Sequence, residues 1–116
     1  MDVGDLRSIC TGLEGVTEDI KWGQDLCFVL SGKMFCVTPL SGPFSVSLKV
    51  GEEEFHELCA TPGIVPAPYV ARYHWILIEN PLRFKPKEWE HYIRQSYELV
   101  KAKLPAKARG IKKKSK

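Results

Sequence analysis

The sequence predicts an α+β fold: an antiparallel β-sheet with the N-terminal and C-terminal helices packed on one face. Three observations lead to this prediction. Two apolar segments flank Ser31-Gly32, a dipeptide that suits a tight hairpin turn. The segment SVSLKV alternates apolar and polar side chains with the period of a strand. The last long segment of the chain carries apolar residues at helical spacing.

The first helix is expected at the N-terminus. It should end between Gly12 and Gly15 and pack one face inward. Its apolar residues recur at helical spacing after an acidic start: Val3, Leu6, Ile9, Cys10 and Leu13.

Three strands should follow this helix. Residues 26–30 and 33–38 are expected to form an antiparallel hairpin, and residues 45–50 a third strand. One face of the third strand should be buried and the other wet, because its side chains alternate. The buried set is Val46, Leu48 and Val50, and the solvent-facing set is Ser45, Ser47 and Lys49.

The middle of the chain predicts a second helix and a fourth strand. Acids occupy the first turn of residues 52–59, as is favourable for a helix dipole, and the apolar residues there share one face. Pro62, Pro66 and Pro68 then favour an extended loop over regular structure. Residues 73–79 should form the fourth strand.

The longest predicted helix begins at Pro86 and is ended by Pro105. Its apolar stripe consists of Trp89, Tyr92, Ile93, Tyr97, Val100 and Leu104. We therefore expect one domain over residues 1–105, followed by a basic, solvated tail over residues 106–116.

Charge is distributed very unevenly along the 116 residues. Residues 1–98 hold nine Lys/Arg and 14 Asp/Glu, whereas the last 18 residues hold eight Lys/Arg and no acid. A basic end attracts polyanions, although it is also a common solubility feature.

Several chemistries are disfavoured. His56, His74 and His91 lie on three different predicted elements, and no sequence motif of a hydrolase, metalloprotease or phosphate loop occurs. The four cysteines lack metal-site or redox spacing and lie among apolar neighbours, so we expect small buried hydrophobes. The prediction is a non-catalytic, monomeric domain without cofactor or metal. No apolar run reaches bilayer-spanning length, so we expect no membrane partner and a cytoplasmic location.

Six segments, in order and spacing, resemble the MmcQ/YjbR family over residues 2–109: KWGQD, LSGKMFCV, VSLKV, Pro62-Gly63, YHW and SYELVKAKLP. The resemblance implies a fold similar to that of CyaY and frataxin. It also implies a small bacterial cytoplasmic protein, for which a DNA-binding role has been proposed from shape. Iron binding through an acidic first helix, associated with frataxin-like folds, is not expected, because the acids here form a thin, broken set that suits helix capping. They are Asp2, Asp5, Glu14, Glu18 and Asp19.

A binding surface on the sheet is the leading functional hypothesis. If Ile76 and Ile78 face the core, Trp75 and Tyr73 join Lys49 on the open face and can stack on bases. If Trp75 is core, His74 is exposed beside Arg72 instead. The candidate nucleic-acid contacts are Lys21, Lys33, Lys49, Arg72, Tyr73, His74, Trp75, Lys112, Lys113 and Lys114.

Trp22 has two interpretations of its own. We expect Trp22 to close one end of the core while Gly23 makes a turn. In the alternative interpretation, Trp22 belongs to an exposed rim of the sheet together with Lys21 and Lys33. DNA is the expected partner of the domain. A protein or peptide partner, or a small-molecule pocket under the proline-rich loop, remains open.

Overall fold

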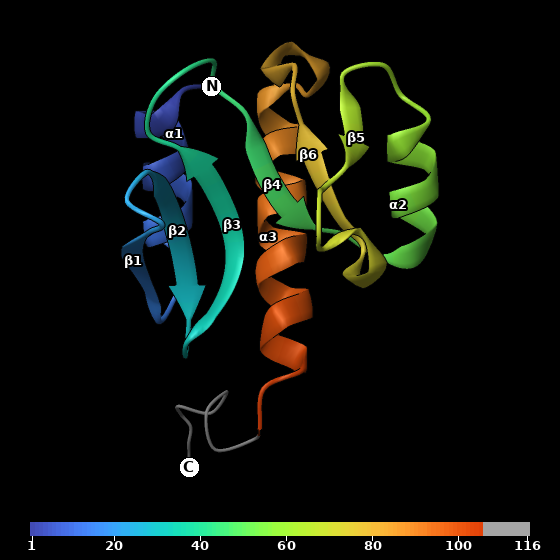
Figure 1. Ribbon diagram of the computed structural model, residues 1–116. Coiled ribbons are helices and arrows are strands. Elements are labelled where there is room, and N and C mark those ends of the chain that lie inside the picture. Colours follow the sequence, from blue (N-terminus) through green and yellow to red (C-terminus); the bar gives the residue numbers. More distant parts are fainter. Residues whose placement is uncertain (106–116) are drawn as a thin grey trace.

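Six strands form one antiparallel sheet in the order β1-β2-β3-β4-β6-β5 (Figure 1). The computed structural model describes residues 1–105, and the predicted tail at 106–116 lies outside the described residues. The strands are β1 (Val16–Lys21), β2 (Asp25–Leu30), β3 (Lys33–Pro39), β4 (Val46–Lys49), β5 (Ile64–Pro66) and β6 (Trp75–Ile78). The helices are α1 (Val3–Thr11), α2 (Glu52–Cys59) and α3 (Pro86–Ala102), with single 3-10 turns at Ala71–Tyr73 and Pro81–Arg83.

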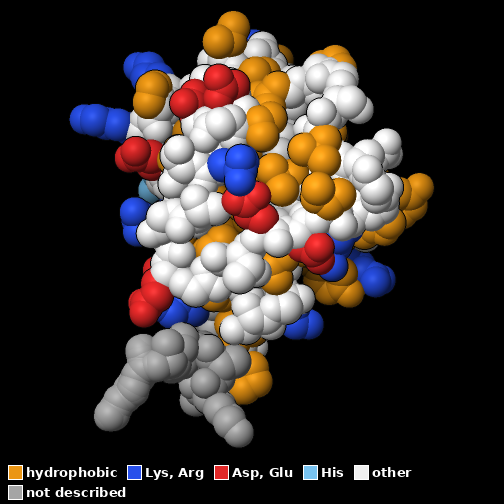
Figure 2. Space-filling model, turned by 90° about the vertical axis from the view of Figure 1, so that its left-hand side faces the viewer, with side chains coloured by type: hydrophobic (Ala, Val, Ile, Leu, Met, Phe, Trp, Pro, Cys, Tyr) orange, Lys and Arg blue, Asp and Glu red, His pale blue; other side chains and the backbone are white. Residues whose placement is uncertain are grey.

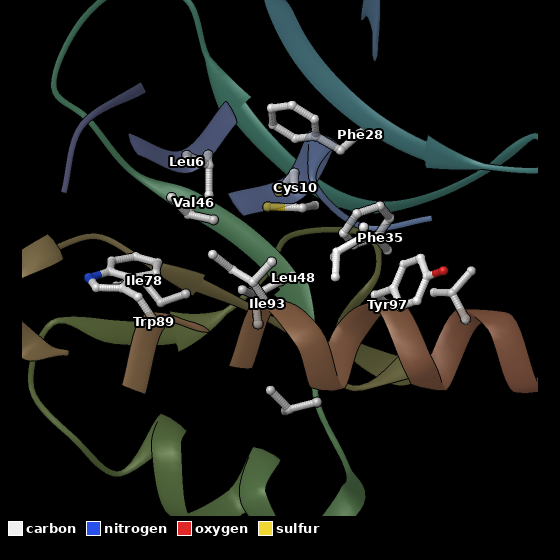
Figure 3. Close-up of a cluster of buried hydrophobic side chains, with 14 of the residues drawn as sticks. Leu6, Cys10, Phe28, Phe35, Val46, Leu48, Ile78, Trp89, Ile93 and Tyr97 are labelled. Carbon is white, nitrogen blue, oxygen red and sulfur yellow. The ribbon is translucent and has the colours of Figure 1, made fainter. Parts of the chain in front are cut away.

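Helices α1 and α3 cover one face of the sheet, and α2 lies beside β5 at the opposite edge from β1 (Figure 1). The predicted fold class is therefore confirmed. Figure 3 shows the core between these layers, where side chains of both terminal helices point toward the strands. Those it labels are Leu6, Cys10, Phe28, Phe35, Val46, Leu48, Ile78, Trp89, Ile93 and Tyr97.

The predicted hairpin is confirmed, with Ser31 and Gly32 both in the left-handed region at φ 49° and 84°. Two such residues give the turn whose twist matches that of the flanking strands. The buried face of the third predicted strand is confirmed, since Val46, Leu48 and Val50 lie in the core. The expectation of a wet opposite face was wrong, because Ser45 and Ser47 are only partly exposed and Lys49 is buried.

A β-bulge in β3 shapes the rest of the sheet. The register with β2 shifts between Phe28 and Val29, which pair with Cys36 and Met34. Phe35 is the extra residue, and it is fully buried against α3, with its ring 5.6 Å from that of Tyr97. A bulge bends its strand, and β3 accordingly pairs with β4 at only two positions.

Ser96 of α3 fills the place where β3 and β4 separate. Its hydroxyl donates to the carbonyl of Phe35 at 2.5 Å and accepts from the N–H of Lys49 at 2.9 Å. One side chain thus satisfies a donor and an acceptor that the splayed strands leave without ladder partners. The hydroxyl of Ser96 is therefore a hydrogen-bond bridge between the two strands.

The sequence-based prediction missed two strands, and both lie at sheet edges. Strand β1 was overlooked because its residues are mostly polar and exposed, and even Ile20 is more than half exposed. Strand β5 lies within the segment predicted to be an extended loop. That prediction was wrong for Ile64–Pro66, since an edge strand tolerates the proline that ends it.

The fourth predicted strand begins two residues later than expected. Tyr73 belongs to a 3-10 turn and His74 is left-handed at φ 66°, so the regular strand starts at Trp75. Ile76 and Ile78 face the core, which places Trp75 and Leu77 on the other face of the sheet.

The cysteines follow the burial expectation in large part. Cys10, Cys27 and Cys36 are buried and Cys59 is partly buried; all four are free. Among residues 1–105, no helix is both long and apolar enough to cross a membrane.

Candidate functional site

The sheet face opposite α1 and α3, which we call the open face, carries two adjoining concavities, one of which extends to residues at the end of α3. The strand register directs Met34 and Val37 of β3, Lys49 of β4 and Trp75 of β6 to this face. The connection between β5 and β6 borders it and is anchored by the N–H of Ala67, which donates to the carbonyl of Trp75 at 3.0 Å.

The first concavity, the lysine pocket, opens where β3 begins, β4 ends and α3 ends. Its volume is about 470 Å³. The bulge and the splay of β3 from β4 create this space, because neighbouring strands that stayed paired would close it. No acidic side chain lines it. The lining consists of Lys33, Met34, Lys49, Val70, Tyr73, Trp75, Val100, Lys103 and Leu104.

Lys49 has an unusual environment in this pocket. Its side chain is on the face opposite the core, as the alternation predicted, yet the residue is only 8% exposed. The ammonium donates to the carbonyl of Tyr73 at 2.7 Å. Burial, and then the positive charge of Lys103, lower the pKa of Lys49 below its ordinary value.

The second concavity, the aromatic groove, has a volume of about 550 Å³. It shares Met34, Val70 and Trp75 with the lysine pocket, so the two concavities adjoin. Its other lining residues are Trp22, Asp25, Val37, Ser47, Ala67, Pro68 and Tyr69.

Two highly exposed aromatic side chains border the aromatic groove. Trp22 is 69% exposed and Tyr69 is 98% exposed. Both have left-handed backbones, with φ 55° and 69°, a conformation that costs bulky residues about 1–2 kcal/mol. Neither ring compensates for this cost by packing into the core.

The expectation that Trp22 closes the core was therefore wrong, and the exposed-rim alternative describes its position. The turn at Gly23 (φ 76°) is confirmed. Trp22 and Gly23 themselves form the tight turn between β1 and β2, closed by the N–H of Gln24, which donates to the carbonyl of Lys21 at 3.3 Å, and the turn holds the tryptophan at the end of the sheet.

The structure brings together only part of the predicted site. Lys33, Lys49, Tyr73 and Trp75 all line the lysine pocket. Trp75, however, is only 9% exposed and forms the floor of both concavities, so it offers little ring surface for stacking.

The remaining predicted contacts lie elsewhere. Arg72 is stacked over the ring of Tyr73 at 4.9 Å, outside the pocket. Lys21 pairs with Asp19 at 3.4 Å. His74 packs against Phe55 of α2, with ring centroids 5.6 Å apart, and lines neither concavity. Lys112, Lys113 and Lys114 lie outside the described residues.

Sequence reasoning missed Tyr69 and Lys103. An aromatic residue between Pro68 and Val70 in a proline-rich connection was a usable signal for Tyr69. Lys103 was counted with the basic end of the chain, and only the tertiary structure places it beside Lys49.

Charge on the β1 side of the molecule is mixed. Figure 2 shows basic and acidic side chains interspersed with hydrophobic groups there. Arg7 and Glu18 form an ion pair at 3.0 Å, and Asp2 caps α1 by accepting from the N–H of Asp5 at 2.8 Å. Within residues 1–105, no three His, Cys, Asp or Glu side chains gather as a metal ion requires.

Comparisons with known proteins agree with the fold. The family model described as YjbR matches residues 11–99. A Deinococcus radiodurans crystal structure, assigned to the domain family DUF419, is similar with a TM-score of 0.83 and 30% identity, covering 93% of this chain and 85% of that one. A Pseudomonas syringae protein shares the fold with a TM-score of 0.69 and 22% identity, covering 85% and 98%. No curated protein matches. The chain thus belongs to the YjbR family, as the resemblance of its motifs implied.

Proposed function

We propose that the open face binds single-stranded nucleic acid, with phosphates at the lysine pocket and bases in the aromatic groove. The adjacency of the two concavities carries this proposal. They share Met34, Val70 and Trp75, so a single strand can contact both. Proteins that bind single strands combine these two elements, a positively charged groove for the backbone and aromatic side chains for the bases.

The exposed aromatic rings favour a single strand over a duplex. The rings of Trp22 and Tyr69 lie open to solvent at the groove, and Tyr73 is about half exposed (49%) at the lysine pocket. A base can stack on such a ring only when its own face is free, which base pairing and stacking in a duplex prevent. The guanidinium of Arg72 over Tyr73 adds a cation near that ring.

A direct test compares single-stranded and duplex DNA of the same sequence, titrated at several salt concentrations and followed by fluorescence anisotropy. We expect the single strand to bind more tightly, with a salt slope of about −0.7 for each phosphate contact. Trp22→Ala and Tyr69→Ala should each lower affinity by about 5- to 150-fold, which corresponds to about 1–3 kcal/mol per stacked base.

Leu82→Ala provides a matched control, because Leu82 is also a large exposed side chain (89%) but lines neither concavity of the open face. It should leave affinity unchanged. Point variants keep the basic tail, so they separate the contribution of the folded face from that of the tail. A chain ending at Pro105, which retains every described helix and strand, should bind more weakly but still depend on Trp22.

Equal affinity for duplex and single strand, or unchanged binding in both aromatic variants, would contradict the proposal. A small aromatic molecule is the second candidate ligand, since the volume of the aromatic groove falls within the range of small-molecule sites. Saturable binding of a free nucleobase without any binding of strands would favour it.

A further inference from the structure

The lysine pocket contains a positive charge that the domain itself leaves unneutralised. Lys49 is more than nine-tenths buried, and its one hydrogen bond is to the neutral carbonyl of Tyr73. An ammonium group has three donors, so two remain for another partner. The ion pairs found within residues 1–105 all involve other residues.

Two further lysines increase this charge. Lys103 lies close enough to Lys49 for the two ammonium groups to interact unfavourably, and Lys33 lines the same pocket. Buried charges in proteins are ordinarily paired, because an unpaired charge loses its hydration without compensation. Lys49 therefore has no acidic partner within residues 1–105, and an anion from outside would supply one.

The amount of charge indicates which anion fits. A phosphodiester inside a strand carries one negative charge, whereas a terminal phosphate carries about −1.5 to −2 at pH 7. The apolar walls formed by Val70, Val100 and Leu104 reduce access of water and strengthen the attraction between a bound anion and the lysines.

We propose that Lys49 and Lys103, with Lys33, bind a phosphomonoester dianion, the phosphorylated end of the nucleic-acid strand. This inference rests on the proposed function, because it places the end of the strand in the lysine pocket and the adjoining nucleotides in the aromatic groove. The domain would accordingly recognise strand ends in preference to continuous strands.

The test uses the full chain and three single-stranded oligonucleotides of one sequence, with a 5′-phosphate, a 3′-phosphate or hydroxyls at both ends. One of the two phosphorylated strands should bind at least tenfold more tightly than the hydroxyl strand. Lys49→Gln and Lys103→Gln should abolish this difference. Lys87→Gln, which changes an exposed lysine near the start of α3 outside the pocket, should preserve it.

Lys103 is exposed, so its variant should fold even if replacement of the buried Lys49 disturbs the carbonyl of Tyr73. Equal affinity of all three strands, with the effects of Trp22→Ala and Tyr69→Ala retained, would overturn the inference and leave the proposed function standing.

Inorganic phosphate and a nucleoside 5′-monophosphate provide the second arm, measured by calorimetry. If they bind saturably and depend on Lys103 while no oligonucleotide binds, the proposed function fails and the phosphomonoester site stands without it. If Lys103→Gln leaves the binding of both small phosphates and of both phosphorylated strands unchanged, the proposed site is wrong.

Discussion

Replacing Ser96 with alanine tests how the splayed sheet is held together. The hydroxyl of Ser96 satisfies the N–H of Lys49 and the carbonyl of Phe35, and the Ser96 side chain is fully buried. Ser96→Ala removes both hydrogen bonds and leaves a space of about one oxygen atom, too small for water to replace it.

The expected loss of stability follows from these two groups. A buried polar group left without a partner costs about 1–3 kcal/mol. Two such groups, with some relaxation of the strands, give a loss of about 2–4 kcal/mol. For a domain of this size, that corresponds to a fall in Tm of roughly 10–30 °C. Alanine is the better helix former, so local helix propensity in α3 acts in the opposite direction and cannot produce the loss.

Urea denaturation and calorimetry measure the change, and Ser8→Ala is the matched control. Ser8 is also a helical serine but lies exposed on α1, so its replacement should change the free energy of unfolding by less than about 0.5 kcal/mol. If Ser96→Ala costs no more than this control, strands β3 and β4 can close and pair directly. The splay would then not be fixed by Ser96, and the origin given for the lysine pocket would be wrong.

Four further predictions follow from other local features. Gly63→Ala should destabilise the domain by about 2 kcal/mol in urea denaturation, because φ is +94° and the new Cβ would lie 2.9 Å from a neighbouring Cβ, whereas Gly4→Ala in α1 should not. Burial raises the pKa of Cys36 well above 9.0 in the folded protein, so this thiol ionises first in the unfolded chain. The free energy of unfolding should therefore fall as the pH rises above about 9, and Cys36→Ala should make that fall smaller. The pKa of Lys49 is lowered in the folded protein, so the unfolded chain holds the proton of Lys49 more strongly. The free energy of unfolding of the unmodified protein, relative to that of Lys49→Met, should therefore rise as the pH rises toward 10.5. Urea denaturation of both proteins at pH 7 and pH 10 would detect this rise. Trp22→Asn should raise stability by about 0.5–1 kcal/mol, since asparagine tolerates a left-handed backbone, while weakening strand binding; a loss of stability would contradict the strain at this position.

The central strands and the terminal helices could be predicted because the order of apolar and polar residues in them follows which side chains are buried. In β4 the alternation marks the face that meets α3, and the stripe of α3 has the helical period. Edge strands record burial weakly: β1 meets one neighbour and α1, and its exposed Ile20 breaks any alternation. Strand β5 is only three residues long, too short for a period to be read.

The candidate site could be predicted only in part, for a related reason. Lys49 was found because strand periodicity assigns it to the wet face. Its burial was not foreseen, since that depends on Tyr73 and on the end of α3, which come together only in the folded chain. Trp22 was assigned to the core because tryptophans are usually buried, a tendency that the geometry of a tight turn overrides.

Departures from local rules are concentrated on the open face, and this concentration argues for function there. Within residues 1–105, four non-glycine residues are left-handed, and all four lie in turns: Trp22 between β1 and β2, Ser31 in the next hairpin, Tyr69 between Ala67 and Val70, and His74 at the end of a 3-10 turn. Trp22 and Tyr69 place bulky, exposed rings at such positions, and both rings border one groove. Beside them Lys49 keeps a buried charge with no acid to neutralise it. The turns require left-handed backbones, but they do not require bulky aromatic side chains, which cost more there than glycine or asparagine. Strain and unpaired charge of this kind persist where a partner supplies the missing interactions. An aromatic, doubly anionic partner such as the end of a nucleic-acid strand supplies both kinds at once.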